Sequence, residues 1–403
     1  MESRRPTSFA APFPAPAAQP GPTPAPMGAP AEAGDSVRLF LAGDVMLGRG
    51  IDQIMPHSVK PVLKEPAVRD AGRYVELARS AGAEIPDRVD VDYVWGDALS
   101  ELGRQSPAYR IVNLETSITT SSDFASGKRI HYRMHPENAR ALGAAEIDAC
   151  VLANNHVMDF GIKGLRSTLS TLETWGIQAV GAGHSQNAAE APAIFDLQDD
   201  RRLILFAYAS ATSGVPPTWG ATAKRAGVSV LPPLEAGDGA LDSVATEILS
   251  RKRPGGLGVV SLHWGGNWGY EVGPEEQAFA RGLIDSGAAD IVYGHSSHHP
   301  RPIEVYRDRL ILYGCGDLLN DYEGIPGHEE FRPNLSLLYF PLLDLRSGRL
   351  RSMTMTTMRI EGFRLALAAA SEADWMAETL SRESEAFGVA VRARDDRRLV
   401  LEW

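Results

Sequence analysis

The sequence of 403 residues is poor in cysteine, and its two cysteines, Cys150 and Cys315, give no disulfide framework. Each stands at the end of an apolar stretch, where a free and buried thiol is expected. No apolar run approaches the roughly 18 residues that a membrane-spanning helix needs. Lysines and arginines are scattered and the net charge is −11, which argues against nucleic acid or an anionic membrane as the main partner.

Three common active-site motifs are also missing. The sequence has no G-x-S-x-G elbow, no P-loop and no G-x-G-x-x-G, so serine-hydrolase, kinase and dinucleotide-binding functions have little support.

Arg4 and Arg5 are followed by frequent prolines and by no continuous apolar segment, unlike the pattern of a signal peptide. Residues 1–35 are therefore expected to form a disordered Pro/Ala-rich tail, and the protein is expected to be cytoplasmic.

What the sequence does contain is an alternation of apolar strands and helical segments. Strands are predicted at 109–115 and 202–210, for example, and helices at 162–175 and 274–286. Such alternation is typical of a layered α/β domain, which we place at residues 36–330.

Toward the end of the chain the pattern changes to antiparallel strand pairs. Residues 303–306 and 309–314 are predicted to form a hairpin, and residues 335–360 are predicted to contain two long strands. A polar helix and a short final strand follow. We assign residues 331–403 to a C-terminal region that packs on the main domain.

Polar residues capable of binding a metal stand where five of the predicted strands end. They are Asp44, Glu115, Asn155, His263 and His295. The carboxyl ends of parallel strands meet at one edge of an α/β sheet, so these side chains are expected to lie together, as in a metal-dependent hydrolase. Structural explanations stay open, because Asp44 suits a turn cap and Glu115 suits an ion pair with Arg49 or with the basic pair Lys128 and Arg129.

The histidines carry the strongest signal. His295 and His298 lie three residues apart in a turn and could face a common ion, because Zn, Mn and Fe all accept imidazole. His156 is followed by Asp159, which could orient the imidazole by accepting its second N–H. Taken alone, His263 is more often explained as a structural histidine.

Two further groups carry weaker signals. Asp317 follows the last hairpin strand and either lines the same edge or caps a helix. Arg133 lies with His131 and His135 in a loop that could meet an anionic substrate.

Seven short segments occur in an order that resembles a known family. They are GDVMLGR, VNLETSIT, HYRMHP, LANNHVMDFG, HWGGNWGYE, GHSSHHP and GDLLND. In this order they resemble the CapA family of poly-γ-glutamate capsule synthesis proteins over residues 37–325. That family is similar to the calcineurin-like metallophosphoesterases, so the resemblance implies a four-layer α/β/β/α sandwich with two metal ions.

The wider similarity also implies roles for individual residues. Asp44 matches the first aspartate ligand, Glu115 the bridging carboxylate and His156 the histidine that contacts the leaving phosphate. Met46 stands where the motif has a histidine, and an extra residue separates His295 from the next histidine, so a mononuclear or weakly loaded centre is implied. One or two ions of Mn, Fe or Zn are expected, with the ligands Asp44, Glu115, Asn155, His263, His295 and His298.

The residues and the resemblance together favour a metal-dependent hydrolase acting on a γ-glutamyl amide or a phosphoester, related to poly-γ-glutamate and capsule biosynthesis. His156, held by Asp159, would be the general acid or the phosphate contact. Arg49 and Arg133 would meet the carboxylates of an anionic polymer or a small anionic substrate. The alternative is a non-catalytic factor that holds the polymer for other capsule-synthesis proteins.

Overall fold

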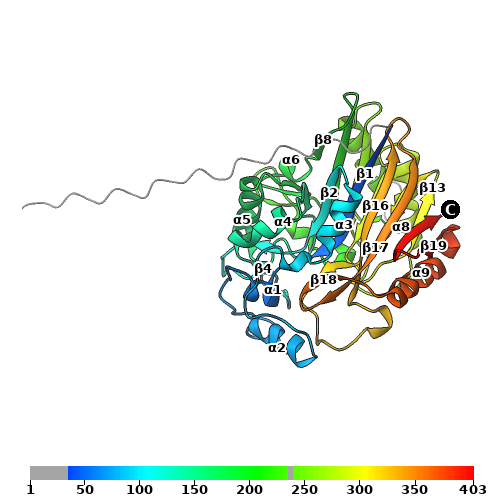
Figure 1. Cartoon of the computed structure of the whole chain (residues 1–403). Helices are drawn as coiled ribbons and strands as arrows, with labels where there is room; N and C mark the ends of the chain where they lie inside the picture. Colours follow the sequence, from blue (N-terminus) through cyan, green and yellow to red (C-terminus); the bar gives the residue numbers. More distant parts are fainter. Residues whose placement is uncertain (1–34, 235–238) are drawn as a thin grey trace, which may run out of the picture.

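The computed structural model describes residues 35–234 and 239–403, which form a mixed α/β protein built on two mixed β-sheets (Figure 1). The tail expected at residues 1–35 lies outside the described residues, apart from Asp35. Across the described ranges, no helix has both the length and the apolar character needed to cross a membrane.

The larger sheet has ten strands within the described residues, in the order β19-β20-β17-β16-β1-β2-β5-β6, with β15 beside β1 and β18 beside β17. The half from β1 to β6 is parallel and the half from β16 to β19 is antiparallel. Its strands are β1 (Ser36–Val45), β2 (Tyr109–Leu114), β5 (Ala149–Val151), β6 (Gln178–Val180), β15 (Asp317–Leu319), β16 (Leu335–Asp344), β17 (Leu350–Glu361), β18 (Arg364–Leu367), β19 (Ala390–Ala393) and β20 (Arg398–Glu402).

The smaller sheet has the strand order β13-β14-β12-β11-β9-β8. Its four central strands are parallel, and each outer strand is antiparallel to its neighbour. The strands are β8 (Ala193–Asp196), β9 (Arg202–Ala209), β11 (Leu257–His263), β12 (Ile291–His295), β13 (Ile303–Tyr306) and β14 (Arg309–Leu312). Two short pairs lie outside both sheets, β3 (Ser117–Ile118) with β4 (Arg133–Met134) and β7 (Ala182–Gly183) with β10 (Gly227–Val228).

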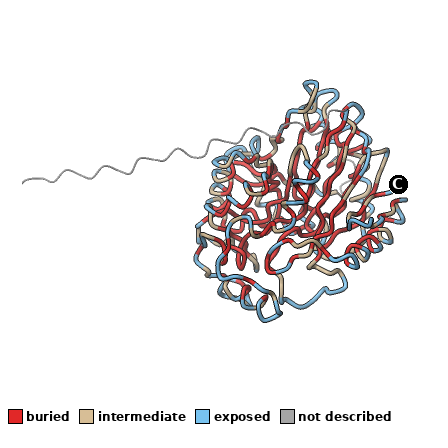
Figure 2. Tube along the Cα trace, in the orientation of Figure 1, coloured by how far each residue is buried: buried red, intermediate tan, exposed pale blue. Residues whose placement is uncertain are grey.

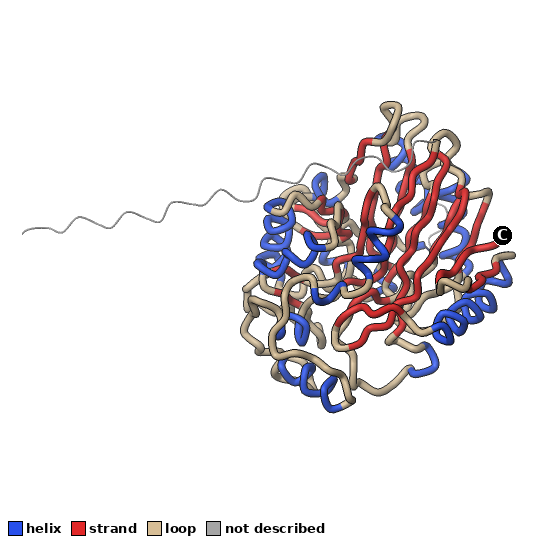
Figure 3. The backbone as a smooth tube through the Cα atoms, in the orientation of Figure 1, coloured by secondary structure: helices blue, strands red, loops and turns tan. Residues whose placement is uncertain are grey.

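The strands gather at the centre of the molecule and the helices lie around them (Figure 3). The α-helix α8 begins with Pro274, a residue favoured in the first turn because the N–H that it lacks has no partner there. The helices are α1 (Arg49–Ile54), α2 (Gly72–Ser80), α3 (Ala98–Gln105), α4 (Arg140–Ala144), α5 (Gly161–Thr174), α6 (Gln186–Ala189), α7 (Gly239–Arg251), α8 (Pro274–Asp285) and α9 (Ala370–Ser384).

Most of the elements predicted from the sequence are confirmed. The predicted strands at 109–115 and 202–210 are β2 and β9, and the predicted helices at 162–175 and 274–286 are α5 and α8. The hairpin of β13 and β14 and the antiparallel pair of β16 and β17 are also present. Because β16 pairs with β1, the C-terminal strands continue the same sheet, while the boundary at residue 330 stays a prediction.

Two large hydrophobic cores hold the sheets and helices together. Buried residues fill the interior of the described structure (Figure 2). In β9, Leu203 and Leu205 belong to the first core and Ile204 and Phe206 to the second, as the two-residue alternation of a strand requires. The first core joins the facing sides of the two sheets, and the second packs α7 and α8 against the other side of the smaller sheet. The facing sheets thereby bring the carboxyl ends of their parallel strands close together.

Candidate metal centre

Strand pairing aligns four of the six predicted ligands at the carboxyl ends of four strands. Asp44 in β1 is paired with Asn113 of β2 and with Asp317 of β15, and Glu115 follows two residues after Asn113. In the smaller sheet, the last residue of β11, His263, is paired with the last residue of β12. Asp44, His263 and His295 therefore get their positions from parallel ladders, and Glu115 directly follows the end of one.

These side chains converge into two groups that could each hold a metal ion. The first contains Asp44, His263 and His295, and the second contains Asp44, Glu115 and Asp317. Within each group the ligand atoms all lie within 4.8 Å of one another, and every member is buried. Asp44 belongs to both groups, so it is the residue through which they join.

Asp317 was not among the ligands predicted from the sequence, although its place at the edge of the sheet was one of two alternatives. The signal that could have identified it is the Gly-Asp pair after an apolar strand, which occurs at Asp44 and again at Asp317. The two strands are parallel neighbours, and that pairing is not visible in the sequence.

The carboxylates of the second group repel one another in a buried place. Burial raises the pKa of Asp44 to about 6, although a hydrogen bond of 2.7 Å from the Asn113 amide to its Oδ1 acts in the opposite direction. Burial is the main reason why the pKa of Glu115 lies well above its usual range, and the charge of the nearby Asp44 raises it further. Asp44 Oδ2 is buried without a hydrogen-bond partner. Such a set is stabilised by a cation, which satisfies the unpaired oxygen and removes the repulsion.

The two histidines of the first group face each other across the pair of strands. Their Nδ1 atoms lie 2.7 Å apart, and His295 Nε2 lies 2.6 Å from Ser261 Oγ. His263 Nε2 lies 3.2 Å from Asn155 Oδ1, so the predicted amide ligand contacts the group through this histidine. Burial lowers the pKa of His295 to about 3 and that of His263 well below its usual range, which favours the neutral imidazole that binds metals.

His156 lies beside the second group. Its Nδ1 is 2.6 Å from Asp159 Oδ2, so the contact predicted from the sequence is present, and its Nε2 is 3.8 Å from Glu115 Oε1. Burial lowers the pKa of His156 to about 4, while Asp159 acts in the opposite direction. Burial raises the pKa of Asp159, but His156 and Lys128 more than offset this effect, so the pKa lies below its ordinary value.

His298 lies at the edge of the centre, in contact with Asp317. Its Nδ1 is 3.0 Å from Asp317 Oδ1, and its Nε2 is 3.0 Å from Asn267 Nδ2. Burial lowers the pKa of His298, but Asp317 more than offsets this and leaves the pKa raised. His298 therefore reaches the second group through Asp317.

The two arginines predicted to bind substrate have partners within the protein. Arg49 pairs with Asp321, its Nε lying 3.1 Å from Oδ2, and with Glu65 at 3.3 Å. Arg133 donates to the backbone carbonyl of Ser121 and, at 2.8 Å, to that of Lys60. Both guanidinium groups are buried, and their role toward a substrate stays a prediction.

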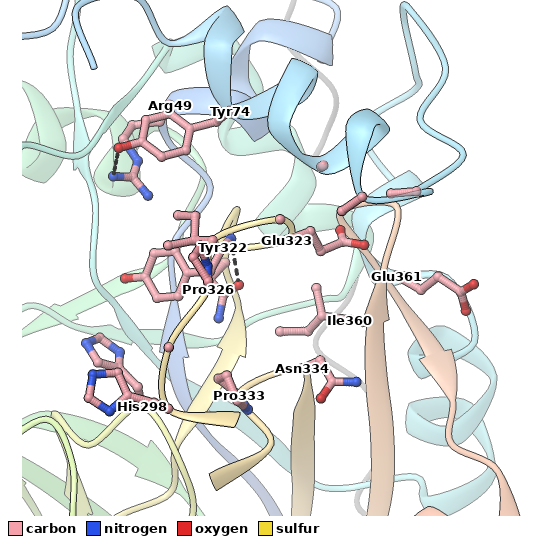
Figure 4. Close-up of a pocket in the computed structure, with 18 of the residues that line it drawn as sticks. Arg49, Tyr74, His298, Tyr322, Glu323, Pro326, Pro333, Asn334, Ile360 and Glu361 are labelled. Atoms are coloured by element: carbon pink, nitrogen blue, oxygen red, sulfur yellow. Dashed lines mark hydrogen bonds between the residues drawn. The ribbon is translucent and has the colours of Figure 1, made fainter. Parts of the chain in front are cut away.

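A cavity of about 650 Å³ lies next to the centre (Figure 4). His298 and Tyr322 lie on one side of it and Ile360 and Glu361 on the other, with Arg49 on its wall. Since His298 also touches Asp317, a molecule held at the centre could extend into this cavity. Its wall contains aromatic, apolar and charged side chains, including Tyr74, Tyr132, Trp268, Ile325, Glu323 and Arg359.

Comparison with known proteins identifies relatives of this chain. A probable polyglutamine synthesis accessory protein of Mycobacterium tuberculosis is 48% identical over 362 residues, which cover 90% of this chain and 95% of that protein. The PGA biosynthesis protein CapA of Bacillus subtilis is 25% identical, over 71% of this chain and 64% of its own length. The capsule biosynthesis protein CapA of Bacillus anthracis is 28% identical, over 59% and 56% respectively.

One solved structure matches 78% of this chain at 11% identity with a TM-score of 0.32, which is too low to support an argument about the fold. The family model described as bacterial capsule synthesis protein PGA_cap matches residues 38–322, a range that contains every residue of the centre. The resemblance to capsule synthesis proteins inferred from seven short segments is thus confirmed. The chain belongs to the bacterial capsule synthesis protein PGA_cap family.

Proposed function

We propose that this protein is a metal-dependent hydrolase that acts on a γ-glutamyl amide or a phosphoester in polyglutamate or capsule synthesis. The observation that carries the proposal is the convergence of Asp44, Glu115, Asp317, His263 and His295 into two buried groups joined by Asp44. A structural core has no need for three buried carboxylates beside two neutral imidazoles.

The donor set fits a divalent ion. Imidazole nitrogens and carboxylate oxygens together suit Mn, Fe or Zn, and the unpaired Oδ2 of Asp44 offers a free ligand atom. We propose two ions, one in each group, with Asp44 as the shared ligand. The fold would then correspond to the four-layer α/β/β/α sandwich of the calcineurin-like metallophosphoesterases.

A divalent ion supplies Lewis-acid polarisation of the scissile bond and makes a water molecule more acidic. The protein residues do the remaining work. His156 presents its Nε2 toward Glu115 while Asp159 holds its Nδ1, so the imidazole is oriented to give a proton to a leaving group at the centre. The adjacent cavity would accept the part of the substrate beyond the scissile bond.

The proposed substrate class rests on the names of the relatives. The Mycobacterium tuberculosis protein is named for polyglutamine synthesis and the Bacillus proteins for PGA and capsule biosynthesis, and we transfer an anionic polymer and capsule-synthesis partners to this chain on that basis. Because Arg49 and Arg133 already have partners, we expect the metal ions to provide most of the attraction for an anion.

The test is metal analysis combined with a substrate screen. Protein expressed with added Mn, Fe or Zn should retain about one to two equivalents and hydrolyse a p-nitrophenyl phosphodiester or a γ-glutamyl peptide. His156→Ala should lower kcat by about 10²–10⁴-fold with the metal content unchanged. A metal-loaded protein with no activity on any of these compounds would refute the proposal.

A non-catalytic role is the second candidate. It is favoured by the word accessory in the name of the Mycobacterium tuberculosis relative and by Met46 at a position where phosphoesterases have a histidine. In this case the protein would bind a γ-glutamyl polymer, with or without metal, and His156→Ala would leave binding unchanged.

A further inference from the structure

We propose that Lys128 is a positioning residue for His156. The inference rests on the proposed function, because it concerns the proton that His156 would give to the leaving group. It goes beyond that function by adding a residue from the segment between β3 and β4 that is not a member of either metal-binding group.

Lys128 is held by three contacts around the imidazole. Its ammonium group lies 2.6 Å from Asp159 Oδ1, donates to the backbone carbonyl of Asn155 and lies 3.3 Å from His156 Nδ1. The ring of Trp219 covers it, with the centroid 5.3 Å from Nζ. The Lys128 side chain is 17% exposed and that of Asp159 is fully buried, so this ion pair is only slightly screened by solvent.

These contacts fix the direction in which the Asp159 carboxylate faces. Oδ1 is taken by Lys128, and Oδ2 accepts the backbone N–H of Tyr132 at 2.7 Å and faces His156 Nδ1 at 2.6 Å. The Tyr132 ring stacks on the imidazole with a centroid distance of 3.9 Å. Without Lys128 the carboxylate could rotate and offer its other oxygen, and the imidazole would follow it.

The contact with the Asn155 carbonyl links this arrangement to the metal groups. Asn155 is the residue before His156, and its side chain contacts His263. One ammonium group thus holds both the main chain that precedes the imidazole and the carboxylate that faces it. A lysine is suited to this task because its ammonium group has several N–H donors, which can reach the Asn155 carbonyl and the Asp159 carboxylate at the same time.

The experiment compares Lys128→Met with the wild type on bis(p-nitrophenyl) phosphate and diphenyl phosphate, whose leaving groups differ in basicity. A proton donor matters most for the more basic phenolate, so we expect kcat to fall by about 10–100-fold on diphenyl phosphate and by less on the nitrophenyl ester. KM and metal content should stay as in the wild type. Lys128→Arg, which keeps the charge, should recover part of the loss.

Lys252→Met is the matched control. Lys252 also pairs with a carboxylate, Asp290, at 2.8 Å and donates to a backbone carbonyl at 2.9 Å, and its side chain is 11% exposed. Its substitution should leave the ratio of the two rates unchanged, even where stability falls. An equal loss on both esters in Lys128→Met would overturn the inference, because a purely structural role lowers both rates together.

A second measurement separates this inference from the proposed function. Nitrogen-15 NMR of metal-free protein reports which ring nitrogen of His156 carries the proton. We expect the neutral ring to be in the Nδ1–H form in the wild type, with Nε2 free to take up the proton that it later gives to the leaving group, and a mixture of forms in Lys128→Met. An unchanged spectrum would refute the inference, whereas absence of hydrolysis by the wild type would refute the proposed function alone.

Discussion

Asp44 is the residue on which the centre depends most, because it is shared by both ligand groups and carries the unpaired oxygen. The residue scale also shows which partners of individual side chains the sequence could not reveal. Arg49 and Arg133 were chosen from the sequence for their charge, but their partners, Asp321 and two backbone carbonyls, come from segments that only the fold brings near. Lys128 was considered from the sequence only as part of a basic pair that could form an ion pair with Glu115.

The raised pKa of Asp44 predicts a pH-dependent instability of the metal-free protein. Because the pKa is about 6 in the folded state against an ordinary value of 3.8, the folded protein holds this proton more tightly than the unfolded chain. The contribution of Asp44 to stability is thus lost as the pH rises from about 4 through about 6. Compared with the wild type, Asp44→Asn should gain up to about 3 kcal/mol of unfolding free energy between pH 4 and pH 7.5.

Urea unfolding of both proteins in the presence of a chelator measures this difference. The lowered pKa values of the histidines change the stability in the opposite direction over the same pH range. Both proteins contain these histidines, so the difference between the two at each pH removes their contribution. A difference in unfolding free energy that does not vary with pH would show that Asp44 does not titrate in this window.

At the scale of elements, the site depends on the close approach of β1 and β15. Asp44 N donates to Gly316 O at 3.0 Å, and a Cβ atom placed on Gly43 would lie 1.6 Å from that same oxygen. Glycine is therefore required at position 43 by the neighbouring strand. This contact brings Asp317 to Asp44, and so it builds one of the two metal-binding groups.

Gly43→Ala should consequently lower the unfolding free energy by about 3 kcal/mol or more and weaken metal binding. The control is Gly103→Ala in α3, where a Cβ atom meets nothing within 4 Å and alanine should stabilise the helix by about 0.5–1 kcal/mol. Thermal unfolding and metal titration of both variants provide the comparison. A Gly43→Ala variant as stable as the wild type would mean that the two strands are further apart than described.

The elements also show what the sequence can and cannot predict. The strand-end positions of Asp44, Glu115, His263 and His295 were predicted because apolar runs of strand length end at each of them. Asp317 stayed ambiguous because an aspartate after a strand can also cap a helix, and its pairing with β1 is a contact across more than 270 residues of chain, which no local pattern encodes.

At the scale of the whole molecule, the centre exists only while the two sheets keep their positions relative to each other. His263 and His295 belong to the smaller sheet, whereas Asp44, Glu115 and Asp317 belong to the larger sheet or follow one of its strands. Tyr293 of β12 links the two by donating its hydroxyl to the backbone carbonyl of Ala42 in β1. The face-to-face packing of two mixed sheets was implied by the family resemblance and not by the composition.

Tyr293→Phe tests this link between the sheets. Loss of the hydroxyl leaves the buried Ala42 carbonyl without this donor, so the unfolding free energy should fall by about 1–3 kcal/mol. Tyr306→Phe, which removes a hydroxyl bound to the side chain of Asp285 near the surface, should change it by less than about 0.5 kcal/mol. Equal effects of the two substitutions in chemical denaturation would argue against the link.

Anomalous diffraction from crystals grown with Mn tests the central claim most directly, because it reports both the presence and the position of the metal. The account predicts at least one peak about 2.0–2.3 Å from the ligand atoms of Asp44, His263 and His295, with a second peak beside Glu115 and Asp317. Crystals of Asp44→Asn should lose both peaks. A wild-type map with no peak at these residues, or with manganese bound elsewhere, would contradict the account.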